Sequence, residues 1–83
     1  MNPTTELRRV ARNVDAGRAT RYFAASLLRR IDDATSADER AAVRTWAVRS
    51  AQRILSGHLR NDEFAIDRAS MLLIAAAATE VAA

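Results

Sequence analysis

Few side chains in this sequence are suited to acid–base, metal-binding or nucleophilic chemistry. There is one histidine, His58, and no cysteine. His58 follows Gly57, where an imidazole can interact with the last carbonyl groups of a helix. The carboxylates stand at expected helix starts or one turn from an arginine, and no pair has a spacing typical of a hydrolase or of an oxygen-ligand metal site. We therefore expect no enzyme activity, no metal ion and no cofactor.

Arginine is the most abundant charged residue in this sequence. The sequence has thirteen arginines, no lysine and nineteen alanines, with a formal net charge of +3. Because lysine also binds phosphate well, its absence indicates the coding bias of a GC-rich genome and weakens the argument for a nucleic-acid partner. Residues 1–57 carry eleven arginines and six acidic residues, whereas residues 58–83 carry two and four. Arg8, Arg9 and Arg12 form a basic patch that is either a solvated helix face or a phosphate contact.

Tyr22 is the centre of the most site-like cluster. Steps of 100° per residue along a helix place it with Arg18 and Arg29 on the side opposite the apolar face, so we expect it to be exposed. An aromatic ring flanked by guanidinium groups suits a base, a phosphate or a protein partner. The alternative is that the ring lies over the aliphatic parts of its neighbours.

Trp46 is the centre of a second cluster, with Arg49 and Arg53 one and two turns further along the same helix. It lies where the apolar face of that helix meets the charged face. A single tryptophan in this position is typical of a core-edge residue with a cation–π neighbour. The alternative is an interface hot spot.

Glycine and proline divide the chain into elements. The only proline is Pro3 and the only glycines are Gly17 and Gly57, and good helix formers fill the stretches between them. Because proline favours the start of a helix and glycine its end, the sequence predicts an all-α fold, a compact bundle of about four helices in one domain, residues 1–83. The predicted helices cover approximately residues 3–15, 19–33, 37–56 and 62–81, the last two being the longest and antiparallel.

Apolar spacing predicts the buried faces, and one motif predicts a helix start. Ser36 and Glu39 have the spacing of a capping box, in which the Ser36 hydroxyl accepts from the Glu39 amide and the Glu39 carboxylate reaches back to the Ser36 amide. We expect Gly17 to end the first helix. The residues expected to face inward are Leu7, Val10, Ala11 and Val14, then Phe23, Ala24, Leu27, Leu28, Ile31 and Ala34, then Val43, Ala47, Ala51, Ile54 and Leu55.

The last predicted helix, residues 62–81, is apolar on nearly all sides. A helix of this kind must be buried on more than one side, and a bundle of four short helices cannot easily surround it. We therefore expect part of its surface to pack against a second copy or another protein. The residues expected at this oligomer interface are Ile66, Leu73, Ile74 and Val81.

The leading hypothesis is a small, non-enzymatic regulatory or inhibitory protein that acts by protein–protein interaction as a homo-oligomer, a kind common in mobile genetic elements. The first alternative is nucleic-acid binding through the arginine-rich face of the first three helices. The second is a small anionic ligand held by arginines of two subunits. The N-terminus does not read as a secretory signal, and the longest apolar run, residues 71–78, is shorter than the ~18–20 residues of a bilayer span, so we expect a cytoplasmic protein without a membrane partner.

Overall fold

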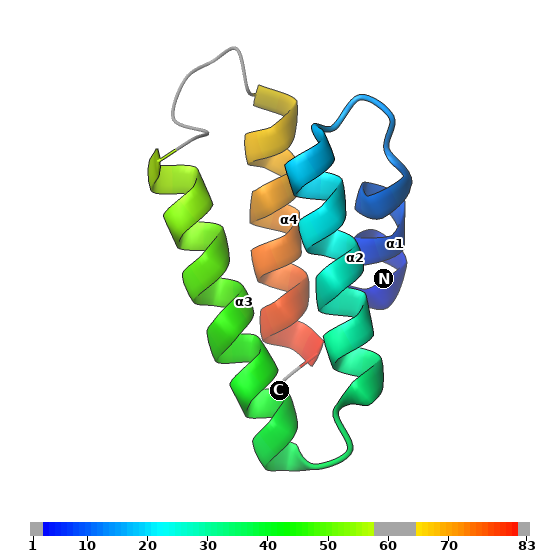
Figure 1. Ribbon diagram of the computed structural model, residues 1–83, viewed down its shortest axis with the longest axis vertical. Coiled ribbons are helices and arrows are strands. Elements are labelled where there is room, and N and C mark those ends of the chain that lie inside the picture. Colours follow the sequence, from blue (N-terminus) through cyan, green and yellow to red (C-terminus); the bar gives the residue numbers. More distant parts are fainter. Residues whose placement is uncertain (1–2, 58–64, 82–83) are drawn as a thin grey trace.

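The computed structural model describes residues 3–57 and 65–81 and confirms the predicted all-α bundle. It contains α1 (Pro3–Arg12), α2 (Arg18–Asp33), α3 (Ala37–Gly57) and α4 (Ala65–Val81). The described part measures 39 × 23 × 20 Å. α3 and α4, with 21 and 17 residues, are the longest helices, and they run antiparallel, as predicted (Figure 1).

The helix α4 is the central element, because it contacts each of the other three helices. α1 packs against α2 and α4, and α3 packs against α4 and α2, whereas α1 and α3 make no contact with each other. α4 therefore has α1 on one flank, α3 on the other and α2 between them. The side of α4 turned away from α2 has no helix of the described chain over it.

The core lies where α4 meets the inner faces of its neighbours. The large side chains excluded completely from solvent are Leu7, Leu27, Met71 and Ile74. Alanines fill much of the remaining contact, which lets helix backbones approach closely but buries little apolar area per residue. The inward faces predicted for α2 and α3 are confirmed: Phe23, Ala24, Leu27, Ala47 and Ala51 are buried, and Leu28, Ile31, Val43, Ile54 and Leu55 pack against them.

The first helix ends earlier than predicted, at Arg12 instead of residue 15. The Asn13 side chain explains the stop, because its carboxamide oxygen accepts the backbone N–H of Asp15 at 3.0 Å and so competes with the helix. Val14, predicted to continue the apolar stripe, is consequently 82% exposed. The prediction that Gly17 ends this helix is also wrong: Gly17 is the N-cap of α2, with φ −64° and ψ 157°.

The predicted capping box is half formed. The Ser36 hydroxyl accepts the Glu39 amide N–H at 3.1 Å, as expected. The Glu39 carboxylate, however, accepts from Thr35, from its amide at 3.1 Å and from its hydroxyl at 3.2 Å, instead of from the Ser36 amide. Glu39, in the first turn of α3, thus binds Thr35, the residue before the Ser36 cap. This contact anchors the turn between α2 and α3.

Some predictions fall on residues outside the described ranges. These are His58 and the first three positions, 62–64, of the last predicted helix. Val81 belongs to α4, but its side chain lies outside the description. Across residues 3–57 and 65–81, none of the helices combines the length and the apolar content that crossing a lipid bilayer requires.

Candidate interaction surface

The outward side of α4 is an apolar strip, which we call the α4 face. Between residues 65 and 78, every exposed side chain is apolar. At a rise of 1.5 Å per residue the strip is about 17 Å long. It includes three of the five large exposed hydrophobic side chains of the described chain, with Leu72 the most exposed of the three at 56%. The members of the α4 face are Ala65, Ile66, Ala69, Leu72, Leu73 and Ala76.

The α4 face corrects the oligomer surface predicted from sequence. Ile66 and Leu73 are exposed, as expected, but Ile74 has no solvent-accessible surface and belongs to the core of the subunit. Position 74 points toward α2, between the flanks occupied by α1 and α3, whereas Leu72 lies on the open side. The sequence alone did not assign Leu72 to this interface, because on an apolar helix the wheel does not show which sector the neighbours cover.

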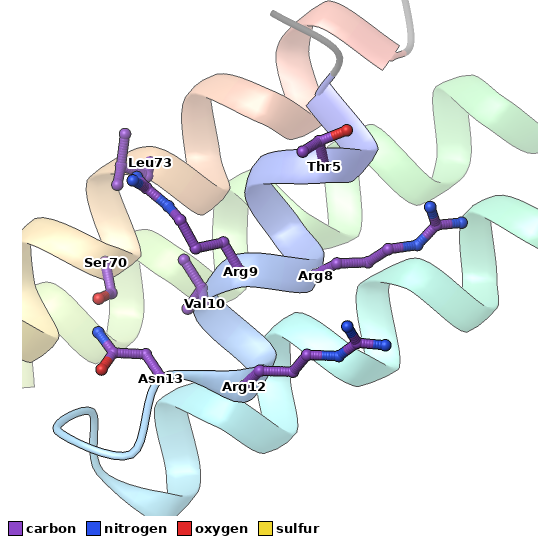
Figure 2. Close-up of a pocket in the computed structure, with 8 residues that line it drawn as sticks. All are labelled: Thr5, Arg8, Arg9, Val10, Arg12, Asn13, Ser70 and Leu73. Atoms are coloured by element: carbon purple, nitrogen blue, oxygen red, sulfur yellow. The ribbon is translucent and has the colours of Figure 1, made fainter.

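A groove of about 850 Å³ runs between α1 and α4, beside the α4 face (Figure 2). Leu73 belongs to both surfaces and joins them. Arg9 extends toward the side of Leu73 and Ser70, while Arg8 and Arg12 extend side by side in the opposite direction (Figure 2). The residues lining the α1–α4 groove are Thr5, Arg8, Arg9, Val10, Arg12, Asn13, Ser70 and Leu73.

The charge in this groove is of one sign. It is lined by three arginines and no acidic residue. Arg9 forms an ion pair with Glu6, 2.7 Å between Nη2 and Oε2. Arg8 and Arg12 make no hydrogen bond or ion pair with any described residue. Arg8, Arg9 and Arg12 are thus all exposed on α1, but only Arg9 extends toward the apolar surface, and the unpaired guanidinium groups of Arg8 and Arg12 extend away from it.

Tyr22 lies on the outer face of α2, as predicted, and is 74% exposed. Arg18 and Arg29 are also exposed on that face. α2 packs on the side of α4 opposite the α4 face, so the Tyr22 cluster and the α4 face lie on different sides of the molecule. The structure thus offers two separate candidate contacts.

Trp46 is half-buried at the edge of the core, and its cation partner differs from the predicted ones. Its ring stacks on Phe23, with centroids 5.2 Å apart and planes inclined by 8°. The guanidinium carbon of Arg30 lies 4.0 Å from its ring centroid. Arg49 and Arg53 are exposed on α3 and do not supply this contact within the described chain. Sequence reasoning missed Arg30 because the pair joins two helices.

Asp67 positions the start of α4, and sequence reasoning missed it too. Its carboxylate Oδ1 accepts the backbone N–H of Gly17 at 2.6 Å, across fifty residues of sequence. A Cβ at position 17 would come within 3.1 Å of Oδ2, so glycine allows this close approach. The contact fixes the α1–α2 turn against the first turn of α4, and with it the edge of the α4 face at Ile66.

Comparison with known proteins identifies no relative: no family model, curated protein or solved structure matches this chain. In the part of the chain that the structure describes, no cluster of three or more histidine, cysteine, aspartate or glutamate side chains is arranged to hold a metal ion.

Proposed function

We propose that this protein is a non-enzymatic regulatory or inhibitory protein that acts by binding another protein through the α4 face. The observation that carries the proposal is that every exposed side chain of α4 between residues 65 and 78 is apolar. Contiguous exposed apolar surface of this kind marks interaction sites in small proteins. The absence of cysteine is compatible with the reducing cytoplasm, where we place the protein.

Self-association is the competing use of the same surface and stays a prediction. Of the interface residues predicted from sequence, Ile74 lies in the core, whereas Ile66 and Leu73 are exposed. Leu72, which was not predicted, is exposed beside them. A strip about 17 Å long on one helix buries far less than the ~800 Å² per partner of a standard protein–protein interface. Association of two copies through this strip alone should therefore be weak.

The test is capture of partners from a lysate of the cells that express the protein. The bait is compared with a Leu72→Ser/Leu73→Ser double variant, which removes apolar surface from the α4 face without touching the core. Tyr22→Ala is the matched control, because it removes an exposed large side chain from the opposite side of the molecule. Captures are made with and without nuclease, and captured proteins are identified by mass spectrometry.

We expect a partner that the unaltered chain and Tyr22→Ala capture, that the double variant does not, and that nuclease does not remove. Loss with Tyr22→Ala but not with the double variant would move the interface to the outer face of α2. Circular dichroism of each bait verifies folding. If all three baits capture the same proteins, neither face is the contact and the proposal fails.

A second candidate function, nucleic-acid binding, is favoured by one observation. Arg8 and Arg12 extend side by side from α1 without a partner among the described residues (Figure 2). Each phosphate neutralised by such a group steepens the fall of affinity with salt. A titration with duplex and single-stranded DNA at about 50 mM salt, where these contacts are strongest, tests it. No binding there removes this candidate.

A further inference from the structure

We infer that the α1–α4 groove binds a small organic carboxylate with a short apolar substituent, and that Ser70 and Asn13 hold the carboxylate group. This site goes beyond the proposed function, because its ligand is a small molecule and the groove shares only Leu73 with the α4 face. It rests on two side chains, one on α4 and one directly after α1, whose donor groups have no partner in the described chain.

Ser70 is a buried polar residue that lacks a hydrogen-bond partner. Only 5% of its surface is exposed, and it lines the groove from the side of α4 (Figure 2). The Ser70 hydroxyl makes no hydrogen bond with any described residue. A hydroxyl group that is largely removed from water costs stability until something bonds to it. Because Ser70 lies at the groove, a ligand there can supply the missing bond.

Asn13 offers a second donor from the other wall of the groove. Its Oδ1 accepts the backbone N–H of Asp15 at 3.0 Å, which holds the carboxamide in place and leaves the NH₂ group to donate. That NH₂ group has no partner among residues 3–57 and 65–81. Figure 2 shows the side chains of Asn13 and Ser70 on the same side of α1. Two free donors from different parts of the chain therefore border one groove.

These donors suit a ligand group that only accepts hydrogen bonds. An ionised carboxylate is such a group, because it has two accepting oxygens and no donor. An amide or amine would bring N–H groups, and no acidic side chain lines the groove to accept them. Arg9 extends to the same side of α1, and only its Nη2 pairs with Glu6. Its remaining N–H groups and its charge favour a carboxylate further, although Glu6 offsets part of that charge.

The rest of the groove specifies the other end of the ligand. Val10, which is buried, and Leu73, which is partly exposed, supply apolar surface beside the two donors. A branched substituent of about four carbons would cover this surface and gain from its burial. The volume of about 850 Å³ lies within the ~300–1,000 Å³ of small-molecule sites.

The experiment titrates the full chain with isovalerate and follows the backbone amide signals by NMR spectroscopy. Isovaleramide is the matched probe, because it keeps the carbon skeleton and replaces the carboxylate by a neutral group with donors. Inorganic phosphate is the third probe, since three arginines line the groove.

Three variants accompany the probes. Ser70→Ala removes one donor. Asn13→Asp removes the other but keeps an oxygen for the Asp15 amide, so the end of α1 should be preserved. Ser50→Ala on α3 is the control, because this serine does not line the groove. The spectrum of each variant verifies that it folds.

We expect isovalerate to shift the amide signals of Asn13, Ser70 and Leu73, with a dissociation constant on the order of 1–10 mM. Isovaleramide and phosphate should bind at least about tenfold more weakly. Ser70→Ala should weaken isovalerate binding about three- to tenfold, as loss of one hydrogen bond does. Asn13→Asp should weaken it more, because a carboxylate then faces the ligand. Ser50→Ala should change the affinity by less than about twofold.

The inference is overturned if about 50 mM isovalerate shifts no signal of the groove. It is also overturned if isovaleramide binds as well as isovalerate, if Ser70→Ala and Asn13→Asp both bind normally, or if phosphate binds more tightly than isovalerate. The last result would assign the groove to a phosphorylated ligand. None of these outcomes touches the proposed function, whose test depends on Leu72 and Leu73 and on captured proteins.

Discussion

Trp46 connects α3 to α2 through contacts that the spacing of residues along either helix alone does not reveal. Phe23 and Arg30 lie two turns apart on α2, and both reach the ring of Trp46 on α3. The aromatic stack adds to apolar burial, and the guanidinium group is attracted to the ring by the quadrupole of its π-system. This contact is important for the α2–α3 packing, because the two helices touch over a limited area compared with the contact between α3 and α4.

Replacing Arg30 with alanine should therefore lower the free energy of unfolding by about 0.5–1 kcal/mol, the range for a cation–π pair at a partly exposed site. Urea denaturation followed by the fluorescence of Trp46, the only tryptophan, measures the effect directly. Arg29→Ala is the matched control, because its neighbouring guanidinium lies on the exposed face of α2, and we expect a change within about 0.5 kcal/mol. Equal losses for both variants would contradict the contact.

Tyr22→Ala should leave the stability of the protein nearly unchanged. The side chain is 74% exposed, and surface substitutions of this kind shift the free energy of unfolding by no more than about 0.5 kcal/mol. The sequence-based hypothesis placed the contact at Tyr22 and expected a loss of partner affinity, whereas binding through the α4 face, as proposed above, should leave affinity for the captured partner unchanged. Thermal melting followed by circular dichroism checks the first part, and titration with the captured partner checks the second. A clear drop in melting temperature would show that Tyr22 is a structural residue.

At the scale of the element, α4 has two apolar sides with different roles. The side that includes Met71 and Ile74 is inaccessible to solvent, and the side that includes Leu72 is open. Both sides have similar composition, so hydrophobicity alone does not distinguish them. The distinction comes from the helices that cover α4.

This difference predicts unequal costs for two substitutions close together in α4. Ile74→Ala should destabilise the protein by about 2–5 kcal/mol, since it leaves a cavity in the core. Leu72→Ala should cost less than about 1 kcal/mol, because its side chain is mostly exposed and alanine is an excellent helix former. Chemical denaturation of both variants gives the comparison. If Ile74→Ala does not fold, Ile74→Val replaces it in the comparison. This smaller substitution should lower the free energy of unfolding by about 0.5–1.5 kcal/mol. Similar costs for both positions would contradict the assigned faces.

The Gly17–Asp67 hydrogen bond joins the α1–α2 turn to α4. Asp67→Ala should destabilise the protein by about 1–3 kcal/mol, because it leaves a part-buried amide without its acceptor. Asp67→Asn keeps an acceptor oxygen and should cost less. Hydrogen exchange of the Gly17 amide, expected to accelerate in the alanine variant, reports on this bond specifically. Unchanged exchange, with Asp33→Ala as the exposed control, would show that the bond is not formed in solution.

At the scale of the whole molecule, the core is thin. Alanines supply much of the buried contact, so the protein hides little apolar area, and a domain of this length is expected to have a stability of roughly 4–12 kcal/mol. The apolar side chains of the α4 face add little to this stability, because they are exposed in the folded chain as in the unfolded one, and their burial would favour binding of a partner.

Much of the fold was predictable because its signals are local. The spacing of apolar residues in α2 and α3 identified their inner faces, and Ser36 and Glu39 marked the start of α3. One error has a local cause, since Asn13 ends α1 early by a side-chain hydrogen bond. The other is tertiary, since Gly17 makes a contact with Asp67 on α4 instead of ending a helix. Tyr22 was placed correctly because a polar helix face is exposed in any packing.

The amino-acid sequence by itself thus determined the helical fold, the surplus of arginine and the excess of apolar surface in the last helix. Only the tertiary structure decided that Ile74 is buried and Leu72 open, that Arg30 and not Arg49 or Arg53 covers Trp46, and that Arg9, unlike Arg8 and Arg12, extends toward the apolar strip. The physical reason is that periodicity describes one helix at a time, whereas burial and pairing depend on which neighbouring helices lie against each side of it.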